Sequence, residues 1–250
     1  MTLSISIVIP TYNEENTITE TIQAVAKEVP GLAEILVVDD GSTDRTAAIT
    51  ESMMADIPQL HLLRQGKNQG KSAALKAGFA ASTGDIVIVQ DADLEYDPRD
   101  IPDLVAPIQE GKADVVYGSR FLVKRAGRVL YYRHYLANRF ITGLSNLFTD
   151  CNFTDVETGY KAFRGEIIRN MILTATRFGF EIEVTAKVAK LKCRTYEVPI
   201  SYHGRTFEEG KKIGTRDGIA ALFYIFKYNL FTSKKKSFTR LPDIPSISRR

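Results

Sequence analysis

Short apolar runs alternate with amphipathic segments along the first 120 residues of the chain. Between the first two runs, Ile18, Ile22, Val25 and Val29 recur at the spacing of one helical face. The runs are apolar at nearly every position, which is typical of strands buried on both faces of a parallel sheet. We therefore predict an α/β fold, a mainly parallel sheet flanked by helices. The predicted strands are LSISIVIP, EILVVDD, LHLLRQ, DIVIVQD and ADVVYGSR.

The pattern changes after residue 120. Residues 131–148 and 178–193 have helical patterns, and residues 194–202 predict a late strand. The chain is accordingly divided into three parts. These are a main domain at 1–215, an apolar C-terminal helix at 216–233 and a basic tail at 234–250, which we expect to be disordered.

Composition and charge are those of an ordinary globular protein. Of the 250 residues, 44% are hydrophobic and 25% are charged. The formal net charge is +3, but it is unevenly distributed, since residues 234–250 hold six basic and one acidic side chain (+5). The other 233 residues therefore carry a net charge of −2, which is not typical of a nucleic-acid-binding protein. With only Cys151 and Cys193, we expect a reducing compartment. We find no signal peptide and no run approaching the ~20 apolar residues of a membrane span.

An acidic cluster follows the fourth predicted strand, in the segment IVIVQDADLEYDP. Asp91, Asp93 and Glu95 stand at every second position, where their charges repel unless water or a cation separates them. Ions such as Mg²⁺ commonly bind through one or two carboxylates plus substrate phosphates. The cluster therefore predicts a metal site, and a solvated acidic loop remains the alternative.

Polar residues also end the second strand, in VVDDGSTD. Asp39 and Asp40 could accept hydrogen bonds from a nucleobase or a ribose, or they could form an acidic turn before a helix. Ligands of open α/β sheets bind outside the carboxyl ends of the strands, so the two acidic segments point to one site. The later segment GKNQGKS lacks the glycine spacing of a phosphate-binding P-loop, since three residues separate Gly66 from Gly70 instead of four.

Eight segments resemble one family of enzymes. The resemblance is to the GT-A-fold glycosyltransferases that include the dolichol-phosphate mannose synthases and their bacterial polyprenyl-phosphate relatives, in glycosyltransferase family 2. It covers roughly residues 5–215 and implies a GT-A (Rossmann-like) fold. The segments are VIPTYNEENTI, ILVVDDGSTDRT, GKSAALKAGFAASTGD, DADLEYDP, GSRF, VETGYKAFR, GFEIEVTAK and EVPISYHGRTFEEGKKI.

The resemblance implies a donor site at the strand ends. Asp91 and Asp93 would hold a Mg²⁺ or Mn²⁺ ion and the donor diphosphate, with Ala92 packed beside them. Glu95 would be a third metal ligand, at a position where the dolichol-phosphate enzymes usually carry Gln. The residues implied to line the nucleoside pocket are Pro10, Tyr12, Glu14, Val38 and Asp40.

The resemblance also implies a cationic acceptor site. Arg120 and Arg133 would receive the acceptor phosphate, and Arg205 and Lys211 would clamp phosphates from a late loop. A phosphate monoester is mostly dianionic near neutral pH, so it needs positioning by cations more than it needs a general base. We expect these four cations and Asp93 to participate directly in catalysis.

The resemblance, together with these residues, implies a metal-dependent inverting enzyme that moves a hexose, mannose or glucose, from GDP-mannose or UDP-glucose to a polyprenyl phosphate. A transferase acting on a glycan hydroxyl is the first alternative, but it would require a carboxylate base near the acceptor. A non-catalytic nucleotide-sugar binding module is the second. We expect a cytoplasmic protein, peripheral at the membrane face, with no nucleic-acid partner.

Contact with the membrane is predicted for residues 219–231. Of these 13 residues, 11 are apolar or aromatic, and only Lys227 and Asn229 interrupt them. The run is too short to cross a bilayer, but Lys234, Lys235 and Lys236 follow it and could be attracted to an anionic lipid surface. The alternative is a helix docked on the protein core.

Overall fold

A seven-stranded sheet forms the centre of the computed structural model, which describes residues 3–122, 128–129, 131–176, 179–204 and 215–243. The strand order is β3-β2-β1-β4-β6-β5-β7, and among these strands only β6 runs antiparallel to its neighbours. The predicted mainly parallel α/β fold is confirmed. The strands are β1 (Ile5–Thr11), β2 (Leu32–Asp39), β3 (Leu60–Arg64), β4 (Ile86–Val89), β5 (Val115–Ser119), β6 (Lys161–Arg164) and β7 (Thr195–Pro199).

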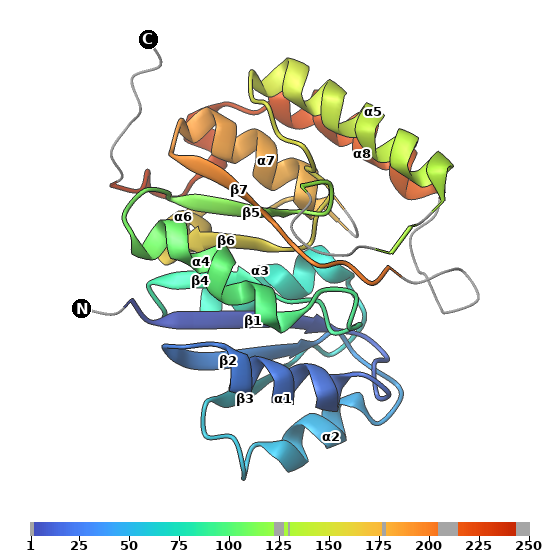
Figure 1. The fold of residues 1–250 in the computed structure, drawn as a ribbon, viewed down its shortest axis with the longest axis vertical. Coiled ribbons are helices and arrows are strands. Elements are labelled where there is room, and N and C mark those ends of the chain that lie inside the picture. The colour runs from blue at the N-terminus through green and yellow to red at the C-terminus, as the bar shows by residue number, and fades with distance from the viewer. Residues whose placement is uncertain (1–2, 123–127, 130, 177–178, 205–214, 244–250) are drawn as a thin grey trace.

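Helices cover both faces of the sheet (Figure 1). One apolar core lies under α1 and α4, and a second joins the other face to α3, α6 and α7. The helices are α1 (Ile18–Glu28), α2 (Thr46–Met53), α3 (Lys71–Ala81), the 3₁₀ helix η1 (Pro98–Asp100), α4 (Ile101–Gln109), α5 (Tyr132–Thr149), α6 (Gly165–Asn170), α7 (Phe180–Leu191), α8 (Thr215–Leu230) and α9 (Lys234–Ser237).

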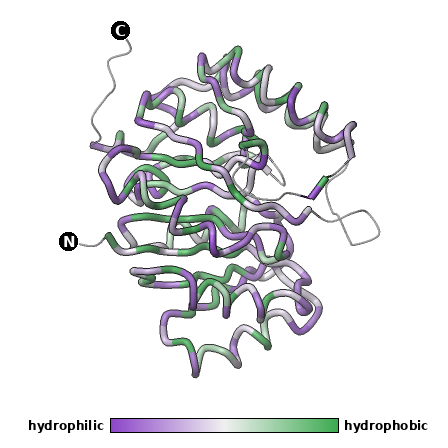
Figure 2. Tube along the Cα trace, in the orientation of Figure 1, coloured by the Kyte–Doolittle hydropathy of each residue, from purple (hydrophilic) through white to green (hydrophobic). Residues whose placement is uncertain are grey.

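The continuous apolar runs of the sequence supply both cores because successive side chains of a strand point to opposite faces. In β1, Ile5, Ile7 and Ile9 enter the core under α1 and α4, whereas Val8 enters the core on the other face. Figure 2 shows the central strands as mainly hydrophobic and many of the loops at their ends as hydrophilic. The sheet is thus buried on both sides, and polar chemistry is confined to its edges.

The C-terminal segment packs against the domain. Helix α8 lies beside α5 (Figure 1), and Ile225 and Tyr228 are buried while Phe223 remains 64% exposed. After α8, Phe238 is buried and its backbone bridges to Met171. Residues 234–243 are therefore ordered against the domain, where the sequence predicted a disordered tail. Among the described residues, no helix is both long and apolar enough to cross a membrane.

The chain changes direction in the sheet next to β1. It proceeds outward from β1 to β2 and β3, then returns to place β4 on the other side of β1. Such a switch point opens a crevice at the carboxyl ends of the strands, where ligands of open α/β sheets bind. The acidic segments after β2 and β4 both lie at this edge (Figure 1).

Candidate active site

The residues predicted to bind the nucleoside gather at the ends of β1 and β2. Pro10 and Val38 are partners in the parallel register of the two strands. Tyr12 follows directly and is 37% exposed. The Glu14 backbone N–H donates to Thr46 Oγ1 at 2.8 Å, which ties the loop after β1 to the start of α2.

Asp40, the fifth of these residues, holds the turn before α3. Its side chain is almost fully buried, and its two oxygens accept the backbone N–H groups of Gln69 at 2.8 Å and Gly70 at 2.6 Å. Gly41 allows the close approach, because its φ is +74° and a Cβ there would lie 2.9 Å from Asn68 N. Asp40 therefore shapes this edge of the crevice through the turn, and a nucleoside contact would have to use the remaining lone pairs.

Asp91, after β4, is paired with a partly buried lysine at the start of α3. The Lys71 ammonium lies 2.8 Å from Asp91 Oδ1 and 3.3 Å from Glu181 Oε1, which belongs to the first turn of α7. Burial opposes the charge on Lys71, but the two carboxylates outweigh it and raise the pKa of Lys71. The lysine is therefore charged at neutral pH and holds the Asp91 carboxylate in place.

Asp91 also has a tight contact with Gly159. Gly159 lies so close that a Cβ on it would be 2.5 Å from Asp91 Oδ2 and 3.0 Å from Tyr96 Cε2. The Gly159 N–H donates to the Tyr96 hydroxyl at 2.8 Å, and the Tyr96 ring stacks on Tyr160 with centroids 4.8 Å apart. The TGY part of the VETGYKAFR segment thus forms a wall against Asp91.

The predicted metal ligands do not all converge. Asp93 Oδ1 accepts the Glu95 N–H at 3.2 Å, which closes a local turn, and the Glu95 carboxylate accepts the Tyr202 hydroxyl at 2.8 Å. In the described part of the chain, no three Asp, Glu, His or Cys side chains are arranged to hold a metal. The structure therefore does not form the predicted three-carboxylate site, because Glu95 is directed to Tyr202.

The remaining pair still fits a divalent ion. Asp91 and Asp93 supply hard oxygen ligands, and Mg²⁺ or Mn²⁺ commonly takes its other ligands from substrate phosphates and water. Ala92, between them, is buried, and its carbonyl accepts the Thr21 hydroxyl at 3.2 Å. This bond anchors the acidic loop to α1, so the loop has a defined backbone without a metal.

Arg120, at the end of β5, forms an ion pair with the fully buried Asp155, and its own side chain is 16% exposed. Its Nε and Nη2 donate to the two oxygens of Asp155 at 2.7 and 2.8 Å, and its guanidinium lies 5.0 Å from the centroid of the Tyr202 ring. Burial opposes the charge of Asp155, but Arg120 outweighs it and keeps the pKa of that carboxyl below its usual range. A bound phosphate would share Arg120 with Asp155.

Of the other predicted cations, the structure describes only Arg133. Arg133 is exposed in the first turn of α5, which begins on the side of the molecule where the strand ends lie (Figure 1). Arg205 and Lys211 fall outside the described residues. Their proposed role therefore remains a prediction.

Four residues of the site were not identified from the sequence: Lys71, Asp155, Glu157 and Glu181. Glu183, in the same GFEIEV segment as Glu181, does not reach the site, because its carboxylate accepts the N–H groups of Thr174 and Ala175 and pairs with Lys187. Glu181, two positions earlier in α7, is the residue that reaches the site. Lys71, Glu157 and Glu181 lie within the segments GKSAAL, VETGY and GFEIEV, which was the available signal for them, whereas Asp155 precedes VETGY and lies outside all three.

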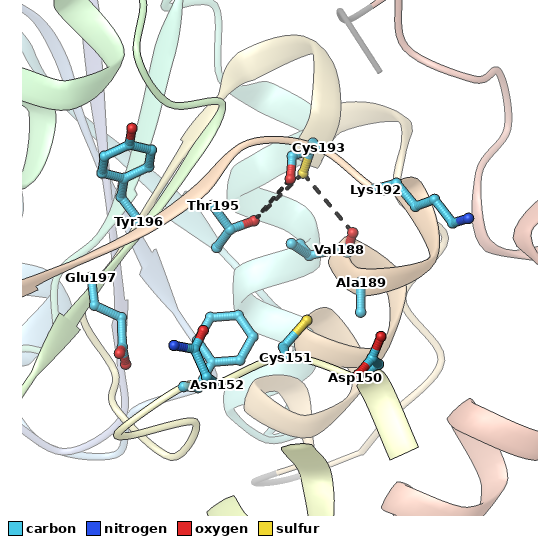
Figure 3. Close-up of a pocket in the computed structure, with 11 residues that line it drawn as sticks. Asp150, Cys151, Asn152, Val188, Ala189, Lys192, Cys193, Thr195, Tyr196 and Glu197 are labelled. Carbon is cyan, nitrogen blue, oxygen red and sulfur yellow. Dashed lines mark hydrogen bonds between the residues drawn. The ribbon is translucent and has the colours of Figure 1, made fainter. Parts of the chain in front are cut away.

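A separate cavity of about 640 Å³ lies between the ends of α5 and α7 and the start of β7 (Figure 3). Cys151 and Cys193 both line it. Burial raises the pKa of the Cys193 thiol to about 12, so this thiol is protonated and unreactive at neutral pH. None of the predicted site residues lines this cavity.

The chain is related in sequence to many known proteins, among them two polyprenyl-phosphate mannosyltransferases. The chain is 31% identical to the undecaprenyl-phosphate mannosyltransferase of Micrococcus luteus, over 86% of this chain and 93% of the relative. It is also 31% identical to the dolichol-phosphate mannosyltransferase of Pyrococcus furiosus, over 85% of this chain but only 60% of that longer protein.

Solved structures agree on the fold. Glucosyl-3-phosphoglycerate synthase of Mycobacterium tuberculosis, in complex with phosphoglyceric acid, superposes with a TM-score of 0.69 at 22% identity, covering 91% of this chain and 80% of that one. The same enzyme has been crystallised with Mg²⁺ and uridine diphosphate, and that structure gives a TM-score of 0.67 at 26% identity, covering 89% of this chain and 79% of the other. The profile of the family described as Glycosyl transferase family 2 matches residues 6–172, and the chain belongs to this family.

Proposed function

We propose that this protein transfers a hexose from a nucleotide sugar to a polyprenyl phosphate, with inversion at the anomeric carbon. The observation that carries the proposal is the segment 155–159. At one end Asp155 holds Arg120, and at the other Gly159 packs against the Asp91 carboxylate. One five-residue segment thus contacts both a carboxylate suited to the donor side and an arginine suited to an acceptor phosphate. The polyprenyl-phosphate mannosyltransferases named above support this acceptor class.

In the proposed reaction, an acceptor phosphate oxygen attacks the anomeric carbon from the face opposite the donor diphosphate. A new C–O bond forms, the old one breaks, and the nucleoside diphosphate leaves with the bonding electrons. A divalent ion held by Asp91 and Asp93 would stabilise the charge that develops on the leaving group. Lys71 keeps Asp91 oriented, and Arg120 and Arg133 would position the acceptor oxygen.

We further propose that the face shared by α5 and α8 contacts the membrane. The two helices pack through Phe148 and Phe226, whose ring centroids are 5.2 Å apart. Large apolar side chains remain exposed beside this contact, and three exposed lysines follow in α9. Apolar exposure next to a basic flank suits the interface of an anionic bilayer. The exposed apolar residues of this face are Leu136, Phe140, Leu147, Ile219, Phe223, Phe226, Leu230 and Phe231.

The donor and acceptor are tested together. Purified protein is incubated with GDP-mannose, UDP-glucose and related donors, each with a short-chain polyprenyl phosphate or with a glycan. Sugar transfer to the lipid phosphate supports the proposal and identifies the sugar and the base. Transfer to the glycan alone supports the hydroxyl-acceptor alternative, and donor binding without hydrolysis or transfer supports the binding module.

The membrane proposal is tested by sedimentation with anionic liposomes. The double variant Ile219→Ser, Phe223→Ser removes two exposed apolar groups of α8 and should leave more protein in the supernatant. Met54→Ser is the matched control, since Met54 is an exposed apolar residue at the end of α2. Equal pelleting of all three proteins would show that this face is not the membrane contact.

A further inference from the structure

The backbone around Glu157 is fixed on both sides by buried groups. Lys161 is fully buried, and its ammonium donates to the carbonyl oxygens of Val156 and Thr158. Gly159, which follows Thr158, donates its N–H to the Tyr96 hydroxyl. These bonds direct the carbonyls on either side of Glu157 toward Lys161 and leave little freedom in the segment.

Glu157 itself has an unusual environment. Its Oε1 atom is shielded from solvent and has no hydrogen-bond partner among the described residues. Its charged neighbours are Glu181 and Asp155, which disfavour ionisation, and Lys161 and Arg120, which favour it. Burial and then Glu181 raise the pKa of Glu157 to about 7. A buried polar oxygen without a partner is costly, so its retention calls for an explanation.

The position of Glu157 suggests which ligand group would be its partner. Glu157 lies between Asp155, which holds Arg120, and Gly159, which contacts Asp91. On the proposed function, the donor diphosphate lies on the Asp91 side and the acceptor phosphate on the Arg120 side. The hexose must lie between these two phosphates, because its anomeric carbon is bonded first to one and then to the other.

The chemistry of the neighbourhood favours a neutral partner. A phosphate beside Glu157 would face the negative charge of Glu181 as well, whereas a sugar hydroxyl can donate to a carboxylate or accept from a carboxylic acid. We propose that Glu157 hydrogen-bonds a hydroxyl of the donor hexose and so contributes to sugar recognition. This inference rests on the proposed function and assigns one residue within that site.

Binding measurements separate sugar recognition from the rest of the site. Titration calorimetry compares the nucleotide sugar with the nucleoside diphosphate that lacks the sugar. Glu157→Ala should weaken nucleotide-sugar binding by roughly 10- to 100-fold, the effect of losing a hydrogen bond to a charged or strongly polar group. Binding of the nucleoside diphosphate should change by less than about twofold, since it has no hexose. Glu157→Gln keeps a hydrogen-bonding group of the same size and should retain most of the sugar-dependent affinity and most of kcat.

Further variants keep the test decisive. If Glu157→Ala does not fold, Glu157→Asp keeps the carboxyl but withdraws it by one methylene, and it should lose the sugar-dependent affinity too. Glu110→Ala removes an exposed carboxylate at the end of α4 and serves as the control. Thermal unfolding establishes that each variant is folded.

Three outcomes would overturn the inference. Equal weakening for both ligands would assign Glu157 a structural role, and unchanged affinity for the nucleotide sugar in folded variants would remove it from the sugar site. Intact binding in Glu157→Gln with kcat lowered by more than about 1,000-fold would identify a general base, as a hydroxyl acceptor would require. A wild-type protein that binds no nucleotide sugar would instead refute the proposed function.

Discussion

The contact between Gly159 and Asp91 allows a quantitative prediction. An alanine Cβ at position 159 would lie 2.5 Å from Asp91 Oδ2, whereas ordinary van der Waals contact begins at 3.4 Å. The φ of Gly159 is not in the positive range, so the backbone itself can accept a side chain. The clash must therefore be relieved by the Asp91 carboxylate, which has to move by about 0.9 Å. Such a shift also disturbs the 2.8 Å contact between Asp91 and Lys71.

We expect Gly159→Ala to lower the transfer rate by roughly 100-fold, since a misplacement of ~1 Å in a catalytic group can have an effect of that size. The overpacking should lower the free energy of unfolding by about 1–3 kcal/mol, so the variant should remain folded at 25 °C. The assay measures kcat and KM with the donor and lipid phosphate found in the donor panel. Urea unfolding gives the stability.

Gly143→Ala is the matched control. Gly143 lies inside α5, and a Cβ there would meet nothing within 4 Å. Its kinetics should equal those of the wild type, and its stability should rise by about 0.5–1 kcal/mol because alanine is the better helix former. A folded Gly159→Ala protein with the wild-type rate would refute the reasoning, since the position of Asp91 would then not matter for transfer.

Three other predictions concern the same site. Asp93→Asn should abolish transfer without unfolding the protein, and a chelator should inactivate the wild type until Mg²⁺ or Mn²⁺ is added; full turnover in excess chelator would contradict this. Asp155→Ala leaves the largely buried Arg120 without this partner and should cost about 3 kcal/mol in urea unfolding, whereas Glu110→Ala should leave the unfolding midpoint unchanged. Because the folded-state pKa of Glu157 is about 7, above the ordinary glutamate value of 4.5, the folded protein binds more protons than the unfolded chain between these values. The contribution of Glu157 to stability should therefore fall by about 3 kcal/mol as pH rises from 4.5 to 7 and stay constant above. Glu157→Gln should lack this decline, and parallel stability curves for the two proteins would disprove it.

The architecture was predictable because its signals are local. Runs such as DIVIVQD are apolar on both faces, which only a sheet covered on both sides can bury. The acidic residues after β2 and β4 come together for a topological reason, since parallel strands place their carboxyl ends at one edge. The pattern also located a helix in the region where α8 forms, but it could not show that α8 has both a buried and an exposed apolar face.

Much of the site was not predictable because its contacts join distant residues. Lys71 meets Asp91 and Glu181, which lie on separate elements far along the chain, and nothing near Lys71 in the sequence indicates that pairing. Glu181 and Glu183 are two positions apart in one helix, and only the packing of α7 shows which of them reaches Lys71. Glu95 has the spacing of a metal ligand but is directed away by Tyr202, a residue more than 100 positions later.

The antiparallel strand β6 has a consequence for how the chain is made. It is inserted between β4 and β5, so residues 86–88 find their second partner only in residues 162–164. At synthesis rates of about 5–20 residues per second, the open side of β4 therefore waits roughly 4–15 s for its partner to leave the ribosome. An apolar strand with an unpaired edge can pair with another nascent chain. A chain that stalls before residue 161 keeps this edge open, so that interval of its synthesis carries a risk of aggregation.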